Sequence, residues 1–122
     1  MENARKLSTI QKRENLNRVY STDAPGPGTA HHNYDIVNSE TGEVLLNVQF
    51  QNGPRKSADS IPGVLDGDLL EIVRDRITSF QSGPFSSDYN AKALEHIELA
   101  LMYLNRRVED RIERNVLGTY QK

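Results

Sequence analysis

The spacing of apolar residues changes once along this 122-residue chain, near Asp66, and that change restricts the folds it can adopt. Upstream, apolar residues recur at every second position on both sides of the turn-forming stretch 38–42; they are Tyr34, Ile36, Val44, Leu46, Val48 and Phe50. A period of two predicts strands with one buried face. Downstream the steps are three and four, which predicts helices. The sequence therefore indicates an α+β fold, with a small antiparallel β-hairpin over about 32–51 and a helical hairpin over about 66–116.

Two helices are expected in the second half. Asp66 or Asp68 can cap the first, which ends before Gly83-Pro84, and Ser86–Asp88 can cap the second. The second helix carries a stripe at steps of three and four, made of Leu94, Ile97, Leu101, Leu104 and Val108. It should run to about residue 116, a length of ~42 Å, which exceeds that of its predecessor. Its C-terminal half then has no helix to pack on, so we expect oligomerisation through the helices.

Composition points the same way and excludes several classes of protein. Hydrophobic residues make up 36% of the chain, and even with the eight glycines added they stay below the about 45–50% of ordinary domains. A net charge of −2 argues against a basic nucleic-acid binder. With no cysteine, no long apolar stretch and no signal-peptide core, an intracellular soluble protein without membrane contact is expected.

The first boundary is Ala24-Pro25-Gly26-Pro27-Gly28, which neither a helix nor a central strand tolerates. Residues 1–23 before it are polar, with scattered apolar positions such as Leu7 and Ile10. They predict a weakly ordered arm or a short helix that needs a partner surface. Residues 24–122 then form a single α+β domain.

His31 and His32 precede the first predicted strand. Adjacent strand residues point to opposite faces and chelate one ion poorly, so loop ordering or packing is the favoured role over metal binding or catalysis. His96 is expected on a helix surface. The turn 26–28 lacks the Gly-Lys-Ser/Thr of a phosphate-binding loop, so a plain turn is favoured there. No catalytic residue, metal site or cofactor is predicted.

Arg107, Arg111 and Arg114 share one helix face at i, i+4 and i+7. Cations favour a helix C-terminus, and acidic neighbours such as Glu109 can pair with them, so this face has an ordinary structural explanation. Arg111 also continues the apolar stripe, where a cation is costly unless an anion meets it. The alternative is therefore an anion site at an oligomer interface, or a surface for nucleic acid or a protein.

Aromatic residues Phe80 and Phe85 flank the turn between the helices, and Asn90 lies in the first turn of the second helix. A ring that stacks and a carboxamide that forms paired hydrogen bonds are the minimum needed to recognise a base. Each feature alone is common in cores and caps.

Several segments, in the same order along the chain, resemble parts of known phage proteins. Residues 69–76, 80–85 and 90–111 are similar to a helical hairpin that two phage families share, the Thoeris anti-defence 1 and the anti-CBASS 2 proteins. Residues 22–34 and 50–54 resemble the Thoeris family specifically. The ending Arg114-Asn115-Val116-Leu117-Gly118-Thr119 resembles a less strict version of the R-G-V-E-G-T motif of these families. Thr29 stands where the Thoeris family has glycine, and His31 where it has asparagine.

The resemblance implies a sponge and not an enzyme. Such proteins bind a cyclic nucleotide immune signal in the host cytoplasm without altering it. For the Thoeris family the signal is glycocyclic ADP-ribose, and some members form hexamers that hold cyclic di- or trinucleotides at separate sites. By position, Phe80 would stack on the base, Asn90 would hydrogen-bond near it and Arg107 and Arg111 would meet phosphates, with Arg55 as an extra cation.

Nanomolar binding corresponds to about −12 kcal/mol, more than these few contacts supply, so a site shared by two chains of a dimer or hexamer is expected. A phosphodiesterase that uses His31 or His32 on the same signal is an alternative. A nucleic-acid or protein-binding module using Arg107 and Arg111 is another.

Overall fold

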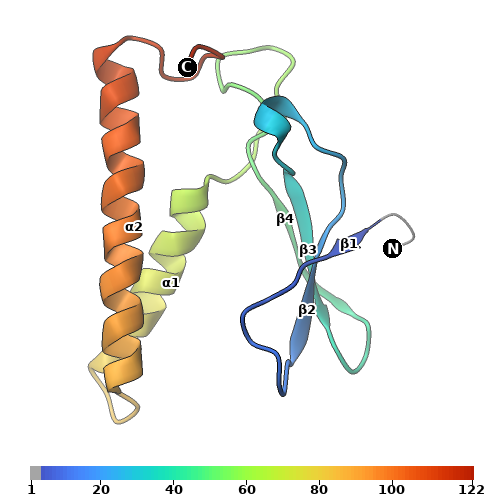
Figure 1. Ribbon diagram of the computed structural model, residues 1–122, viewed down its shortest axis with the longest axis vertical. Helices are drawn as coiled ribbons and strands as arrows, with labels where there is room; N and C mark the ends of the chain where they lie inside the picture. Colours follow the sequence, from blue (N-terminus) through green and yellow to red (C-terminus); the bar gives the residue numbers. More distant parts are fainter. Residues whose placement is uncertain (1–3) are drawn as a thin grey trace. The chain divides into compact units, whose positions relative to one another are not determined.

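A computed structural model describes residues 4–122, which form two compact units, one ending at Val64 and the other beginning at Leu65. The first unit holds an antiparallel sheet in the order β1-β2-β3-β4 (Figure 1). Its strands are β1 (Arg5–Lys6), β2 (Asn17–Ser21), β3 (Asn33–Asn38) and β4 (Val44–Gln49). The predicted hairpin of β3 and β4 is confirmed, and Tyr34 pairs with Val48 as the period of two requires.

The prediction of a weakly ordered or helical arm is wrong for residues 5–6 and 17–21. β2 pairs with β3 along its full length, Val19 opposite Ile36 and Ser21 opposite Tyr34, and β1 adds to its outer edge. The unit boundary accordingly lies after Val64 and not after Asp23. The pairing joins segments on opposite sides of the Pro/Gly loop, so local periodicity carried no sign of it.

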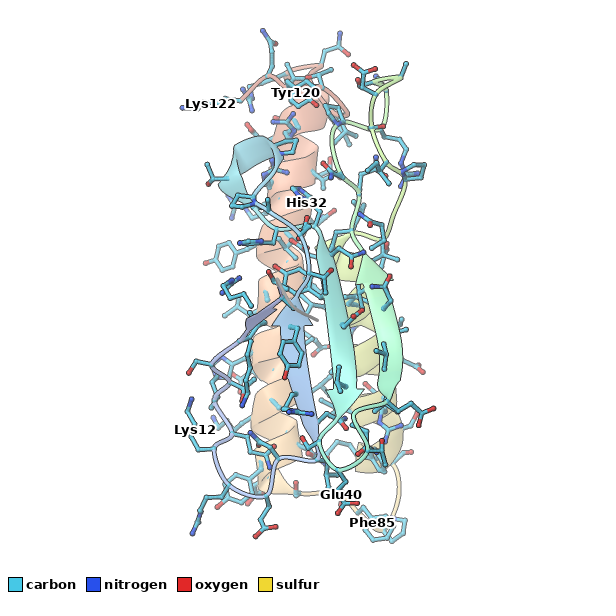
Figure 2. The ribbon with its side chains drawn as sticks, turned by 90° about the vertical axis from the view of Figure 1, so that its right-hand side faces the viewer. Lys12, His32, Glu40, Phe85, Tyr120 and Lys122 are labelled. Atoms are coloured by element: carbon cyan, nitrogen blue, oxygen red, sulfur yellow. The ribbon has the colours of Figure 1, made fainter. Side chains whose placement is uncertain are left out.

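The two faces of the sheet differ in chemistry. One carries Val19, Tyr34, Ile36, Leu46 and Val48, with Phe50 edge-to-face on Tyr34 at 5.7 Å between centroids. The other carries a chain of amides: Asn47 Nδ2 donates to Asn33 Oδ1 at 2.9 Å, and Asn33 Nδ2 donates to Gln49 Oε1 at 2.9 Å. In Figure 2, His32 marks the end of the sheet where β3 begins, and Glu40 marks the opposite end.

Two glycine-type positions shape the loops of this unit. A Cβ at Gly63 would lie 2.4 Å from the carbonyl oxygen of Gln49, so the backbone after β4 folds back at a distance that only glycine permits. In the turn η1 (Pro27–Thr29), Thr29 has a φ of 62°, a left-handed conformation in which glycine costs least. The left-handed backbone at position 29 therefore explains why the Thoeris family, which this chain resembles, is expected to have glycine there.

The second unit is a helical hairpin of α1 (Asp66–Gln81) and α2 (Asp88–Glu113), packed against each other (Figure 1). The predicted bounds hold within a few residues, and Ser87 caps α2 by accepting from the N–H of Asn90 at 3.0 Å. The first helix begins differently from the prediction: Leu65 is its N-cap residue, and Asp68 accepts the Leu65 N–H at 2.9 Å.

The C-terminal end of α2 is a Schellman turn. The N–H of Val116 donates to Arg111 O and that of Asn115 to Ile112 O, both at 2.9 Å, and Asn115 has a φ of 57°. Helix α2 therefore stops at Glu113 and not at about residue 116. Asn115 stands where the resembling family has glycine, and asparagine is the residue that best tolerates this left-handed conformation after glycine.

Much apolar surface of the hairpin is exposed. None of the residues of α1 is buried, and in α2 only Arg111 is. The predicted stripe lies on the side of α2 that faces α1, half-buried from Leu94 to Leu104 and exposed at Val108. At 100° per residue, a second apolar group lies on the opposite side of α2. It comprises Leu99, Met102 and Tyr103, which are 43%, 59% and 64% exposed.

Candidate functional site

The predicted base-stacking residue, Phe80, lies in the last turn of α1, beside the interhelical turn. Its side chain is 38% exposed. The guanidinium of Arg76, one turn earlier in α1, lies 5.1 Å from the centroid of its ring. This is a cation–π contact that was not predicted, although the spacing of i and i+4 between an arginine and an aromatic residue is a readable signal.

Asn90 lies at the same end of the hairpin as Phe80. It is half-buried in the first turn of α2, and its backbone N–H is committed to the Ser87 cap. Its side-chain amide makes no hydrogen bond to any residue in 4–122 within the usual distance. The amide therefore keeps its donor and acceptor for another molecule.

Arg107 and Arg111 lie toward the other end of the hairpin and have different surroundings. Arg107 is exposed and forms no ion pair with the residues that the structure describes. Arg111 is only 8% exposed, and its Nη2 donates to the carbonyl oxygens of Val116 and Thr119, each at 3.0 Å. The three arginines are therefore not an equivalent set, since Arg114 pairs with Asp110 at 3.1 Å.

Arg111 is a buried charge without a counter-charge among residues 4–122, where no carboxylate oxygen lies within 4.0 Å of its guanidinium. Two carbonyl oxygens satisfy hydrogen-bond donors but supply only partial negative charge. A buried cation in that condition is costly unless an anion joins it.

One hairpin cannot bring its aromatic end and its cationic end to one small ligand. Asn90 and Arg107 are 17 positions apart in α2, which at 1.5 Å per residue is about 26 Å. Figure 2 shows the same separation, with Phe85 at the interhelical turn and Tyr120 beyond the opposite end of α2. Phe80 and Asn90 form one group, and Arg107 and Arg111 form another.

Arg55 belongs to the sheet unit and closes its own loop. Its Nε donates to Gln51 Oε1 at 2.8 Å and its Nη2 to Gly63 O at 3.3 Å, while the side chain stays exposed. These contacts give Arg55 a structural role in closing the loop. Its Nη1 remains available to donate to an anion.

The two histidines pack and order the Pro/Gly loop, as favoured from the sequence. His31 Nδ1 lies 2.7 Å from Asp23 O and 3.2 Å from the Oγ of the buried Ser21. His32 is buried, with its ring where a Cβ on Gly26 would be 3.2 Å away. This is not the geometry of a catalytic triad, because Ser21 and Asp23 approach the same ring nitrogen and Ser21 is 1% exposed.

Asp23 supports the same loop. Its carboxylate accepts the backbone N–H groups of His32 at 2.9 Å and Asn33 at 3.2 Å. Burial raises the pKa of this carboxyl, but the two backbone donors and the charge of His31 outweigh it, so that the pKa lies below its ordinary value. Asp23 is thereby held ionised as a loop anchor.

Within the described residues there is no group of histidine and acidic side chains arranged to hold a metal ion. No helix of that part of the chain is long and apolar enough to cross a bilayer.

The chain is similar to a known domain family and to a named phage protein. The model of a domain described as the Acb2/Tad1 hairpin matches residues 43–109, more than half of the chain, and this range includes Arg55, Phe80, Asn90 and Arg107. The protein named Thoeris anti-defense 1, from Bacillus phage SBSphiJ7, is 40% identical over 78 residues, or 64% of this chain and 54% of the relative. The chain thus spans about half the length of the curated relative it matches.

Proposed function

Because this chain belongs to the Acb2/Tad1 hairpin family, we propose that it is a phage anti-defence protein that binds a cyclic nucleotide immune signal and releases it unaltered. Glycocyclic ADP-ribose is the main ligand, since the relative is a Thoeris anti-defense protein and residues 22–34 and 50–54 resemble that family. Cyclic di- or trinucleotides are held at separate sites. The protein acts in the host cytoplasm, without a membrane or nucleic-acid partner.

The observation that carries the proposal is the buried guanidinium of Arg111, which has no carboxylate within 4.0 Å in residues 4–122. A phosphate supplies the missing charge and accepts from the nitrogens that the carbonyls of Val116 and Thr119 leave free. Arg107, exposed and unpaired in the described part of the chain, lies one turn away and adds a second donor.

The base binds at the other end of the hairpin. Phe80 offers a partly exposed ring for stacking, and the amide of Asn90 offers a donor and an acceptor. Since about 26 Å of helix separates this end from Arg107, the ligand is held between two copies of the chain. An antiparallel arrangement brings the aromatic end of one copy to the cationic end of the other.

The exposed apolar residues of α2 favour such an assembly. Leu99, Met102 and Tyr103 lie on the side of α2 that does not face α1, and together with the half-buried stripe they make both sides of the helix apolar. A helix that is apolar on two sides is stable when both are covered. We propose a homo-oligomer, a dimer or a hexamer, formed through the hairpin.

The ligand stays intact in this proposal. His31 and His32 are the residues on which a phosphodiesterase would depend. His31 Nδ1 hydrogen-bonds to Asp23 O, and the buried ring of His32 packs against Gly26. Arg55, Arg107 and Arg111 carry positive charge but cannot act as general bases at neutral pH.

A release experiment tests the proposal. The purified chain is incubated with glycocyclic ADP-ribose, unbound ligand is removed by filtration, and the protein is heated to release what it holds. Recovery of intact ligand is the expected result and gives the stoichiometry per chain. An altered ligand would indicate an enzyme, and unchanged ligand in the filtrate would overturn the ligand assignment and direct the same assay to cyclic di- and trinucleotides.

A further inference from the structure

We infer that Arg76 is a ligand-contacting cation in addition to Arg107 and Arg111, and that it binds a phosphate next to the base stacked on Phe80. This inference rests on the proposed function and adds a residue to that site. It has three supports on the hairpin itself: the surface around Arg76, the partners that Arg76 lacks, and its position against the ring.

Arg76 interrupts a strip of exposed apolar residues on α1. Ile72, Arg76 and Phe80 follow one another at steps of four and so lie along one side of the helix. Ile72 is 65% exposed and Phe80 38% exposed, and the neighbouring Val73 is 41% exposed. Any molecule that covers this apolar strip also removes water from the guanidinium of Arg76.

The neighbouring Arg74 has a structural role and serves as a comparison for Arg76. Its Nη1 lies 3.2 Å from Glu71 and its Nε lies 2.8 Å from Glu98 on α2, and these carboxylates raise its pKa, with the Glu98 hydrogen bond the larger cause. Arg76 has no carboxylate within 4.0 Å in residues 4–122. Of these two arginines on α1, Arg74 is thus paired with carboxylates and Arg76 is not.

The ring of Phe80 holds Arg76 in place without neutralising it. The guanidinium lies 5.1 Å from the ring centroid, a cation–π contact that fixes its position. The planar fork of nitrogen donors stays available, and this fork matches the oxygens of a phosphate. In a nucleotide the sugar keeps the phosphate near the base, so a base stacked on Phe80 brings an anion within reach of Arg76.

The ligand class that this geometry selects is a nucleotide whose phosphate lies close to a stacked base, as cyclisation enforces. An uncharged nucleoside gains nothing from Arg76. An extended ligand, in which the phosphates are far from the base, gains from Arg107 and Arg111 but not from Arg76.

Matched substitutions test the inference by calorimetric titration of the full chain with glycocyclic ADP-ribose. We expect R76Q to weaken binding about 10- to 100-fold, as for the loss of one charge-assisted contact. R74Q removes the same charge from the same helix and should stay within about twofold, because exposed ion pairs contribute little. R76K keeps the charge but not the fork and should fall between them. Raising the salt concentration should weaken the wild type more steeply than R76Q.

The outcomes separate the two proposals. If the wild type binds and R76Q behaves like R74Q, Arg76 is not a ligand contact and the proposed function stands. If the wild type does not bind glycocyclic ADP-ribose, the proposed function fails for this ligand and the inference fails with it. If R76Q alters the assembly in size-exclusion chromatography, R76K becomes the test, and wild-type affinity in R76K would overturn the inference.

Discussion

The loop-closing polar side chains of the sheet unit and the arginines of the helical hairpin differ in where they find partners, although the sheet unit also holds three buried polar atoms with no hydrogen bond within residues 4–122: Arg18 Nε, His32 Nδ1 and Ser39 Oγ. In the sheet unit, Asp23 anchors a loop, Arg55 closes another, and Asn33 and Asn47 bond each other across the strands. In the hairpin, Arg74 and Arg114 have carboxylate partners, whereas four arginines have none within 4.0 Å in the described residues: Arg76, Arg106, Arg107 and Arg111. Polar groups satisfied inside a unit stabilise that unit, whereas groups left unsatisfied are available to another molecule.

This difference predicts that substitutions in the hairpin change ligand binding and that substitutions in the sheet unit change stability.

Phe80→Ala should weaken binding of glycocyclic ADP-ribose by about 5- to 150-fold, because stacking of a base on an aromatic ring contributes about 1–3 kcal/mol. Arg111→Ala should also weaken glycocyclic ADP-ribose binding, because its guanidinium is proposed to meet the phosphate, and it should weaken any cyclic oligonucleotide site as well. It should in addition loosen the tail that Arg111 holds through Val116 O and Thr119 O. Titration with both ligands checks this, with Phe85→Ala, 74% exposed at the turn, as the control. Equal losses for both ligands in both variants would contradict separate sites.

Gly63→Ala should destabilise the sheet unit by about 1–3 kcal/mol, the usual cost of overpacking. The added Cβ would lie 2.4 Å from Gln49 O and 2.5 Å from the carbonyl carbon of Phe50, and backbone atoms cannot rotate away. Chemical denaturation measures the change in the free energy of unfolding. Gly42→Ala is a useful comparison, because a Cβ there has no atom within 4 Å and only the positive φ of 74° opposes it.

Asp23→Asn should cost about 1 kcal/mol, the difference between charged and neutral acceptors for two backbone N–H groups. Because the pKa of Asp23 in the folded chain lies below its ordinary 3.8, its contribution is present in full above 3.8. That contribution is lost as the pH falls through the lower folded value. Unfolding curves at several acidic pH values check this, and the variant should lack that part of the loss. An identical pH dependence in both proteins would exclude Asp23 as the cause.

Thr29→Gly should raise the free energy of unfolding by about 0.5–1 kcal/mol. Glycine relieves the strain of the left-handed conformation at a φ of 62°. It also gives the unfolded chain more conformational freedom, which offsets part of this stabilisation. A shift in thermal midpoint measures it. A destabilised variant would mean that the Thr29 side chain contributes more than its strain removes.

The helices could be predicted because their signals are local. Steps of three and four, a serine cap and a Gly-Pro stop all lie within the segments they define. β1 and β2 could not, since their pairing partners lie beyond the Pro/Gly loop and the alternation in residues 17–21 is short. The early end of α2 depends on one left-handed residue, Asn115, which an amino-acid pattern marks only weakly.

The candidate site was predictable only in part, for a similar reason. Phe80, Asn90, Arg107 and Arg111 were named from residue type and resemblance, but their division between two ends follows from the length of α2. The carbonyl partners of Arg111 exist only because the chain turns back after Glu113. Arg76 was missed because the argument for it depends on the absence of a carboxylate partner. The sequence places several acidic residues nearby, so it does not show that none of them pairs with Arg76.

Because α2 is rigid, it acts as a spacer between the end proposed to bind the base, at Phe80 and Asn90, and the end proposed to bind the phosphates, at Arg107 and Arg111. Each added residue lengthens an α-helix by about 1.5 Å and rotates everything beyond it by about 100°. Lengthening the spacer by one residue would turn the arginines, and the part of the apolar stripe beyond the insertion, away from their present directions. Adding a whole turn would restore their direction while displacing them by about 5 Å. Ligand size in such an assembly is thus set in steps of a helical turn and cannot be adjusted continuously.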